Sequence, residues 1–351
     1  MIYDVIIVGG GQSALACAYY LRKTSLKYLI IDANKYCGGS WSQNWQNLDL
    51  FSAAQHSSLP GWLMPKTKNE YPTKEEAIDY LCQYEKRYDF PIKRGIKINN
   101  IKKEAGLFLL KSEQKNFKTK VVIAATGTQS KPIIPEVNGR NSFKGIQLHS
   151  SQYRKAEDFS NKKVLIVGEG NSGAQVLAQV SKVTKTKWAV KNEPQFLPDD
   201  VDGKDLFDQA SAKYKAKQQG KEFRPKNYNI GSIVMVPQVK EARDRGVYTE
   251  FNSIRSITET GVKWNDGKHE EFDVIIWCTG FGYATDYLKN LTEIQQNGQI
   301  ATSGTVVKDV DGLWLVGFGQ WTGFASATLS GVGRSARKTV SEIKEYLSFL
   351  E

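Results

Sequence analysis

Two glycine-rich turns, about half a chain apart, constrain the fold of this 351-residue sequence more than any other feature. The first, at residues 9–14, follows the apolar run 5–8, and the second, at residues 168–173, follows the apolar run 164–167. One such turn would mean little, because many loops are rich in glycine. Two of them, each placed where a buried strand passes into a helix, predict a chain that binds two dinucleotides. Such proteins usually pass a hydride from a nicotinamide to a flavin.

The first turn has the residue types that a bound pyrophosphate requires. Gly9 permits the tight turn after the strand, Gly11 lets the backbone approach the phosphates, and the small Ala14 lets the following helix pack on the strand. The helix expected at 12–22 directs its first N–H groups toward the phosphates. A second strand then ends at Asp32, 21 positions after Gly11, near the spacing of a carboxylate that binds ribose hydroxyls.

The second turn repeats this pattern with Gly168, Gly170 and Gly173. Lys191 follows the expected partner strand and stands 21 positions after Gly170, the offset that Asp32 has from Gly11. A carboxylate repels a 2′-phosphate and an ammonium attracts it. We therefore expect FAD in the first site and NADPH in the second, with NADH also possible. Lys191 could equally be a plain surface lysine, and two further candidates for the phosphate are Arg243 and Arg245.

Composition narrows the class of protein. A hydrophobic content of 40% and a charged content of 24% are typical of a soluble globular chain. No apolar run approaches the roughly 18 residues that span a bilayer, and the N-terminus has no signal-peptide pattern, so we expect a cytoplasmic protein without a membrane partner. The net charge of +11 comes from scattered lysines, which argues against nucleic acid as a partner. A homodimer is possible.

The four cysteines, Cys17, Cys37, Cys82 and Cys278, form no Cys-x-x-Cys motif. The spacings of redox-active dithiols and of zinc knuckles are therefore absent, and we expect neither a paired redox disulfide nor a metal site.

The fold expected is α/β, with two Rossmann-like dinucleotide-binding domains (three-layer ββα/βαβ) and the NAD(P)H domain inserted into the FAD domain. The expected boundaries are 1–158 for the first part of the FAD domain, 159–272 for the NAD(P)H domain and 273–351 for the return segment. Thr73 opens a capping box and a helix to about Tyr88. Short strands are expected at 96–101, 107–111, 121–124, 246–251, 256–260 and 274–277. The polar stretch 209–228 is either an exposed helix or a mobile insertion.

Three further segments resemble one family. Residues 124–127 and 277–281 look like the two Ala-Thr-Gly-type turns of flavoproteins that bind two dinucleotides. Residues 143–153, Phe-Lys-Gly-Ile-Gln-Leu-His-Ser-Ser-Gln-Tyr, resemble the fingerprint of flavin-containing monooxygenases, Phe-x-Gly-x-x-x-His-x-x-x-aromatic. Residues 50–52, 57–62, 198–203 and 321–329 are similar to the short bacterial branch of that family found in arsenic-resistance operons. The resemblance covers nearly the whole chain.

The resemblance implies an NAD(P)H-dependent flavin monooxygenase that uses O2. Its reduced flavin would form a C4a-hydroperoxide and oxygenate a small soft nucleophile, such as a sulfide, an amine or trivalent arsenic, or a ketone. The expected FAD-binding residues are Gly9, Gly11, Ser13, Ala14, Asp32, Gly39, Trp41, Thr126, Gly127, Gly319, Thr328 and Leu329. The expected NAD(P)H-binding residues are Gly168, Gly170, Asn171, Ser172, Gly173 and Lys191.

Related monooxygenases often carry an Asn beside the flavin, in a loop corresponding to residues 51–55, and this chain has none there. Gln55 or His56, as catalytic groups, or the bound nicotinamide cofactor could replace it. His149, within the fingerprint, is expected to position the linker of the nicotinamide domain rather than to carry protons. Backbone N–H groups at 328–331, where the last helix is expected to begin, are candidates to hold negative charge on the reduced flavin. The aromatic-rich loops 44–64 and 318–324 are expected to line the substrate pocket.

Three alternatives remain open. A disulfide reductase also uses two nucleotide folds, but it needs two neighbouring cysteines. A Baeyer–Villiger enzyme would more often have Trp at the position of Tyr153. A flavin-binding redox sensor without catalysis would share the same two turns.

Overall fold

The computed structural model describes residues 1–201, 203–223, 231–323 and 325–350. The chain divides into two compact units. Unit 1 comprises residues 1–42, 52–131 and 282–351, and unit 2 comprises residues 43–51 and 132–281. The expected insertion of one nucleotide-binding domain into another is confirmed. No helix in these described ranges is both long enough and apolar enough to cross a membrane.

Unit 1 is built on a mixed sheet whose central strands are parallel. The strand order is β15-β16-β17-β6-β1-β2-β3, and the hairpin β4–β5 joins it through β6. The strands are β1 (Ile2–Val8), β2 (Tyr28–Asp32), β3 (Ile92–Arg94), β4 (Asn100–Glu104), β5 (Leu107–Lys111), β6 (Phe117–Ala124), β15 (Thr302–Ser303), β16 (Val306–Val307) and β17 (Leu313–Leu315). Because β17 pairs with β6, the return segment completes the sheet that the N-terminus begins.

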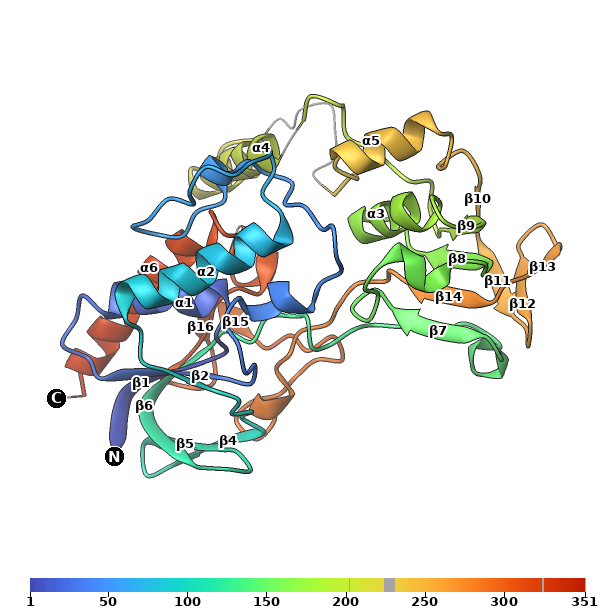
Figure 1. Ribbon diagram of the computed structural model, residues 1–351. Coiled ribbons are helices and arrows are strands. Elements are labelled where there is room, and N and C mark those ends of the chain that lie inside the picture. The colour runs from blue at the N-terminus through green and yellow to red at the C-terminus, as the bar shows by residue number, and fades with distance from the viewer. Residues whose placement is uncertain (202, 224–230, 324, 351) are drawn as a thin grey trace. The chain divides into compact units, whose positions relative to one another are not determined.

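Three helices cover one face of this sheet, as Figure 1 shows: α1 (Gln12–Leu21), α2 (Lys74–Tyr88) and α6 (Val332–Ser348). Helix α1 is largely buried, since it packs against α6, α2 and the sheet. Helix α2 begins at the predicted capping box, in which the Glu76 N–H donates to the Thr73 hydroxyl and the Thr73 N–H donates to the Glu76 carboxylate. Helix α6 buries a stripe at helical spacing: Val332, Ala336, Val340, Ile343 and Leu347.

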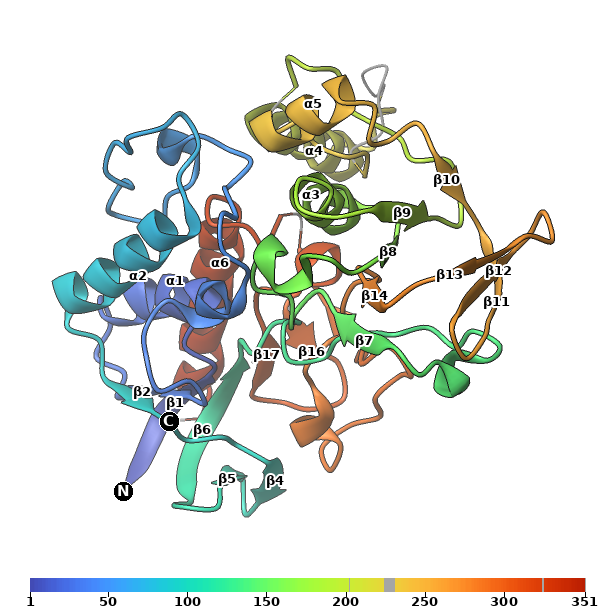
Figure 2. The same ribbon diagram turned by 45° about the vertical axis from the view of Figure 1, so that its right-hand side comes forward.

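Unit 2 has a parallel sheet in the order β10-β9-β8-β14-β7, with an antiparallel sheet β11-β12-β13 (Figure 2). Its strands are β7 (Ile146–His149), β8 (Val164–Val167), β9 (Thr186–Ala189), β10 (Phe251–Asn252), β11 (Ile254–Ile257), β12 (Gly261–Trp264), β13 (His269–Glu271) and β14 (Val274–Trp277). Its helices are α3 (Asn171–Val180), α4 (Gly203–Gln218) and α5 (Pro237–Asp244). Short 3-10 turns occur in both units: η1 (Gly39–Gln43), η2 (Ala54–His56), η3 (Arg140–Ser142), η4 (Ala156–Phe159), η5 (Asp286–Leu288) and η6 (Gly319–Trp321).

The unit boundaries fall after residues 131 and 281, whereas the sequence suggested 158 and 272. Strand pairing explains this, because β14 forms parallel ladders with both β7 and β8. The fingerprint segment and the strand expected to begin the return segment therefore both belong to unit 2.

The bounds of several strands and helices differ from those expected from the sequence. The single strand expected at 96–101 is replaced by β3 and β4 on either side, and the strand expected at 246–251 begins only at Phe251. The last helix begins at Val332 rather than at Thr328, and the Gly331 N–H donates to the Thr328 hydroxyl in the turn that precedes it. The polar stretch is helical up to Gln218, and residues 224–230 lie outside the described residues. So do Asp202 and Phe324, which belong to segments that carried the family resemblance.

Candidate nucleotide-binding sites

Each glycine turn is closed by the backbone of a distant strand end. Gly9 has a φ of +106°, and a Cβ there would lie 2.5 Å from the carbonyl oxygen of Ala125, just after β6. Gly168 has a φ of +123°, and a Cβ there would clash with the carbonyl oxygen of Cys278, just after β14. The two Ala-Thr-Gly-type turns are therefore the partners against which the two glycine turns pack. In each unit, only glycine can adopt this backbone conformation and also fit in the space available.

At the middle position of each turn, neither the backbone conformation nor the packing within the protein requires glycine. Neither Gly11 nor Gly170 has a φ in the left-handed region. A Cβ on Gly170 would have no neighbour within 4 Å, and a Cβ on Gly11 would meet only the Cα of Gly39, at 3.8 Å. Packing would thus tolerate a side chain at both positions. Close approach of a phosphate to the backbone accounts for the glycines, so both turns fit a dinucleotide.

The third small residue completes each turn. A Cβ on Gly173 would clash with the carbonyl oxygen of Gly168, which also accepts a hydrogen bond of 2.9 Å from the Trp188 indole. Ala14 occupies the equivalent place in the first turn and is fully buried. Both helices α1 and α3 begin directly after their turns, with Gly11 and Gly170 as N-caps, so their first N–H groups face the expected phosphate positions.

The return segment of the chain reaches the first turn. Gly317, after β17, lies directly against the Ser13 hydroxyl in the first turn of α1. Gln12 forms a second connection, since its amide donates to the Ala327 carbonyl at 2.5 Å and accepts from the Trp41 indole at 3.0 Å. Three distant segments therefore meet at the N-terminus of α1. This arrangement brings together the expected FAD-binding residues of the N-terminal and C-terminal parts.

Other expected FAD-binding residues have mainly backbone partners. The Thr126 hydroxyl donates to the Ala284 carbonyl at 2.7 Å, and the Gly127 carbonyl accepts from the Ala284 N–H at 3.0 Å. Gly39 has a φ of +56° and lies against the Gly11 backbone. Gly319 begins η6, and its carbonyl accepts from the buried Ser326 hydroxyl.

Thr328 and Leu329 precede helix α6 instead of opening it. Leu329 is buried, and the Thr328 hydroxyl donates to the Ala325 carbonyl at 2.9 Å. The expectation that residues 328–331 form the first turn of the last helix is therefore wrong.

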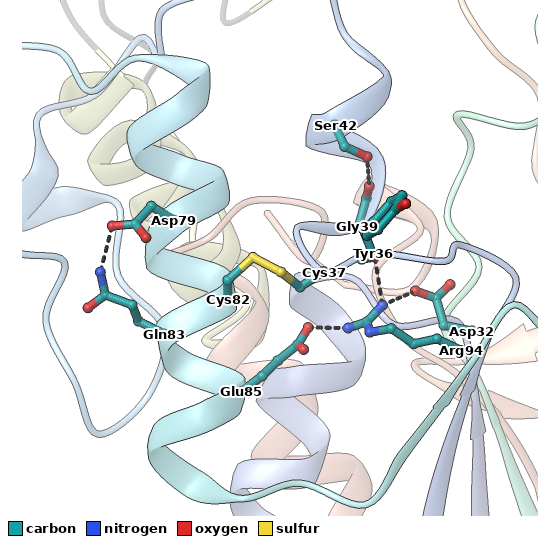
Figure 3. Close-up of a disulfide and its surroundings, with 10 residues drawn as sticks. All are labelled: Asp32, Tyr36, Cys37, Gly39, Ser42, Asp79, Cys82, Gln83, Glu85 and Arg94. Atoms are coloured by element: carbon teal, nitrogen blue, oxygen red, sulfur yellow. Dashed lines mark hydrogen bonds and ion pairs between the residues drawn. A yellow bond between two sulfur atoms is a disulfide. The ribbon is translucent and has the colours of Figure 1, made fainter.

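Asp32 lies at the end of β2 beside the first turn, where a Cβ on Gly10 would lie 2.5 Å from its carboxylate. Asp32 is only 3% exposed, and its carboxylate pairs with the Arg94 guanidinium at 2.7 Å. Arg94 also pairs with Glu85 of α2 at 2.5 Å and donates to the Tyr36 carbonyl at 2.8 Å (Figure 3). Burial raises the pKa of Glu85, and the Arg94 charge opposes that rise. Each carboxylate keeps free lone pairs, so Asp32 can still accept from a ribose hydroxyl.

A disulfide joins Cys37, in the loop after β2, to Cys82 of α2 (Figure 3). The expectation of no paired cysteines is therefore wrong. The two residues are 45 positions apart in the sequence, and the fold brings their Cα atoms to 5.3 Å. Local spacing could not reveal a pair that depends on how α2 packs against the loop. The other two cysteines, Cys17 and Cys278, are free and buried.

In the second site, Lys191 follows β9 as expected and is exposed. Its backbone N–H donates to the Glu169 carboxylate at 3.1 Å, and the neighbouring Asn192 amide donates to the same carboxylate at 3.1 Å. Asn171 begins α3, and its side-chain oxygen accepts from the Val234 N–H at 2.8 Å. Ser172 is half-buried in the first turn of α3.

Of the two further candidates for the phosphate, Arg245 lies away from the glycine turn and Arg243 is paired with a carboxylate. Arg245 donates to the Ala178 carbonyl and pairs with Glu241, so it lies at the C-terminal end of α3, the opposite end from the glycine turn. Arg243 pairs in a bidentate manner with Asp199, at 2.6 and 3.0 Å. The Arg243–Asp199 pair joins residues 44 positions apart, so local sequence spacing could not reveal it.

The fingerprint residues fasten β7 within unit 2. Both ring nitrogens of buried His149 have partners, since Nε2 lies 2.9 Å from the Gly280 carbonyl oxygen and Nδ1 lies 3.1 Å from the Ser151 N–H nitrogen. The ring therefore carries its proton on Nε2 and is neutral. Burial lowers its pKa, although the Gly280 hydrogen bond opposes this effect. The Tyr153 ring is buried in the core, and its hydroxyl donates to Gln179 at 3.0 Å.

The remaining catalytic candidates, Gln55 and His56, lie in η2, where their side-chain nitrogens are 3.2 Å apart. The loop 44–64 is divided between the units, because residues 43–51 belong to unit 2. There Trp45 packs on Tyr153 and the Gln46 N–H donates to the Arg154 carbonyl. Sequence reasoning missed Gln12, Arg94 and Glu169. Gln12 and Glu169 stand inside the two glycine turns and could have been noticed from their positions, whereas Arg94 could not.

Comparisons with known proteins agree with this geometry. The family model of pyridine nucleotide-disulphide oxidoreductases matches residues 6–202. The solved structure of a flavin-containing monooxygenase from Stenotrophomonas maltophilia has 40% sequence identity and a TM-score of 0.90, with 99% of both chains covered. An uncharacterized oxidoreductase, CzcO, from Bacillus velezensis is 30% identical over 97% of this chain and 99% of its own length. The probable indole-3-pyruvate monooxygenase YUCCA1 of Arabidopsis thaliana is 26% identical over 98% of this chain and 90% of its own.

Proposed function

Since the chain belongs to the pyridine nucleotide-disulphide oxidoreductase family and is an FAD-dependent NAD(P)H monooxygenase, we propose that unit 1 holds FAD and unit 2 holds NADPH. The observation that carries this assignment is the pair Gly11 and Gly170. Both positions are occupied by glycine, although neither the backbone conformation nor the packing within the protein requires glycine there. A phosphate that approaches the backbone supplies the missing reason in each unit.

In unit 1, different residues would bind different parts of FAD. The N–H groups at the start of α1, including that of Ser13, would bind the pyrophosphate. Asp32 would accept from the ribose of the adenosine half, and its ion pair with Arg94 holds that carboxylate in place. The segment from Gly317 to Leu329, which lies against α1 through Gly317 and Ala327, would hold the other half of the cofactor.

FAD bound by unit 1 would supply the redox chemistry of the monooxygenase reaction, with NADPH bound by unit 2 as its reductant. The chain binds and orients the two cofactors and excludes water. His149 is neutral and uses both ring nitrogens within unit 2, so it acts as a positioning residue and moves no proton. We propose a small substrate with a soft reacting atom, such as a sulfide, an amine or trivalent arsenic, or a ketone.

One observation favours a disulfide-reductase function, namely the Cys37–Cys82 disulfide. A catalytic disulfide must lie beside the flavin ring to receive its electrons. Cys37 instead lies in the loop after Asp32, on the side proposed for the adenosine ribose (Figure 3). This placement supports a structural role for the bond, and the monooxygenase assignment is kept.

The test is oxygen transfer by the purified FAD-loaded protein. With NADPH, methyl phenyl sulfide and ¹⁸O₂, we expect the sulfoxide to carry one labelled oxygen, measured by mass spectrometry. Gly11→Ala should abolish labelling by preventing FAD binding, whereas Gly106→Ala, in the turn between β4 and β5, should retain it. Oxidation of NADPH coupled to reduction of a disulfide reagent, without labelled product from a panel of sulfides, amines, arsenite and ketones, would overturn the proposal.

A further inference from the structure

Glu169 brings a negative charge to the place where the second site distinguishes its cofactors. It stands between Gly168 and Gly170 in the turn after β8, and its carboxylate reaches the residues that follow β9. There it accepts from the Lys191 backbone N–H and from the Asn192 amide, both at 3.1 Å. The carboxylate therefore lies across the carboxyl ends of two neighbouring parallel strands of unit 2.

The end of the second strand is where a Rossmann fold meets the 2′ position of the adenosine ribose. In unit 1 this place is taken by Asp32, the last residue of β2. In unit 2 the strand register places Val190 there, and Lys191, the next residue, would alone favour a 2′-phosphate. The Glu169 carboxylate reaches the same place from the glycine turn, so unit 2 offers both a cation and an anion there.

We propose that Glu169 sets the preference of unit 2 between the two nicotinamide cofactors. Its carboxylate accepts a hydrogen bond from the 2′-hydroxyl of NADH and repels the 2′-phosphate of NADPH. Lys191 acts in the opposite direction, because its ammonium attracts the phosphate. The two side chains therefore act against each other in the choice between NADH and NADPH. This inference rests on the proposed function, in which unit 2 holds the nicotinamide cofactor.

Surface exposure limits the size of the effect. Glu169 is half-buried and Lys191 is exposed, so salt screens their interaction with a phosphate. The preference should accordingly depend on ionic strength. A neutral side chain of the same shape at position 169 should improve binding of the phosphorylated cofactor most at low salt.

The experiment measures binding without turnover. NAD⁺ and NADP⁺ are titrated calorimetrically into the FAD-loaded protein, its Glu169→Gln variant and a control variant, Glu193→Gln. Each titration is done at about 20 and about 200 mM salt, because the distance over which charges are screened shortens severalfold between these concentrations. Glu193 is exposed and stands two positions after Lys191. We expect Glu169→Gln to raise the ratio of NADP⁺ to NAD⁺ affinity about tenfold at low salt and less at high salt. Glu193→Gln, which removes an exposed charge of the same sign, should change it less than about twofold because solvent and salt screen that charge.

Lys191→Ala provides the opposing change and should lower the same ratio. Bound FAD, measured by its absorbance, verifies that each variant is folded. If the ratio is unchanged in Glu169→Gln while the wild type binds both cofactors, the role of Glu169 is refuted and the proposed function stands. If the wild-type protein binds neither NAD⁺ nor NADP⁺, the assignment of unit 2 itself is overturned.

Discussion

Gly9 lies so close to Ala125 that a methyl group on its Cα would come within 2.5 Å of the Ala125 carbonyl oxygen. The same relationship joins Gly168 to Cys278 in the other unit. Each nucleotide turn is thus shaped by the backbone that follows a neighbouring parallel strand. This explains why glycine turns and Ala-Thr-Gly-type turns occur together in this chain, although they are far apart in its sequence.

Gly9→Ala is expected to destabilise unit 1. The substitution adds backbone strain at positive φ to a steric clash with Ala125, and the two together should lower the free energy of unfolding by about 2–4 kcal/mol. The measurement is urea unfolding of the FAD-free protein. Gly106→Ala is the matched control, since Gly106 has a φ of +78° but no neighbour within 4 Å of a Cβ. It should cost only about 1 kcal/mol of backbone strain. Equal effects of the two substitutions would contradict this account of the turn.

Arg94→Gln should weaken both the fold and the FAD site. Removal of the guanidinium leaves the Asp32 and Glu85 carboxylates close together and largely buried without a cation. Loss of one partner from a buried ion pair typically costs about 3–5 kcal/mol. Lys144→Gln, which breaks an exposed pair with Glu259, should cost less than about 1 kcal/mol. Denaturant unfolding and FAD titration check this, and normal FAD affinity in Arg94→Gln would argue against a role for Asp32.

Reduction of the Cys37–Cys82 disulfide should destabilise the protein. A bond that closes a loop of this length contributes about 2–4 kcal/mol, mainly by restricting the unfolded chain. A thiol reductant should therefore lower the Tm of the wild type and leave that of a Cys37→Ser, Cys82→Ser double variant unchanged. An unchanged wild-type Tm, with reduction verified by thiol counting, would be inconsistent with this contribution.

His149 should make stability depend on mildly acidic pH. Burial lowers the pKa of this imidazole below its ordinary value of 6.5. The unfolded chain therefore binds a proton more readily than the folded chain, so stability falls as pH drops below about 6.5. In His149→Gln the loss of stability between pH 7.5 and 5.5 should be smaller by up to about 1 kcal/mol. A slope identical to that of the wild type would mean that His149 takes up its proton without unfolding.

The strand and helix pattern around both turns could be predicted because it is local. The apolar runs, the glycines and the capping box at Thr73 each specify their element within a few residues. The insertion of one domain into the other could also be predicted. Two similar β-α-β units followed by a further glycine-rich return segment leave few other arrangements.

Features that depend on packing between distant segments could not be predicted. Cys37 and Cys82 meet only because α2 lies against the loop after β2. Arg94 ends β3, and only the pairing of β3 with β2 places it beside Asp32. The unit boundary near Phe281 likewise follows from the ladder between β14 and β7, which no single segment of sequence records.

The most direct test of two separate dinucleotide sites is the binding of each cofactor to Gly11→Ala and Gly170→Ala. FAD and NADP⁺ are titrated into the FAD-free form of each variant, and circular dichroism verifies the fold. Gly11→Ala should lose at least about tenfold in FAD affinity and keep its NADP⁺ affinity, and Gly170→Ala should do the reverse, because each added methyl group blocks one phosphate position. Unchanged affinities in both variants, or loss of the same cofactor in both, would contradict the account.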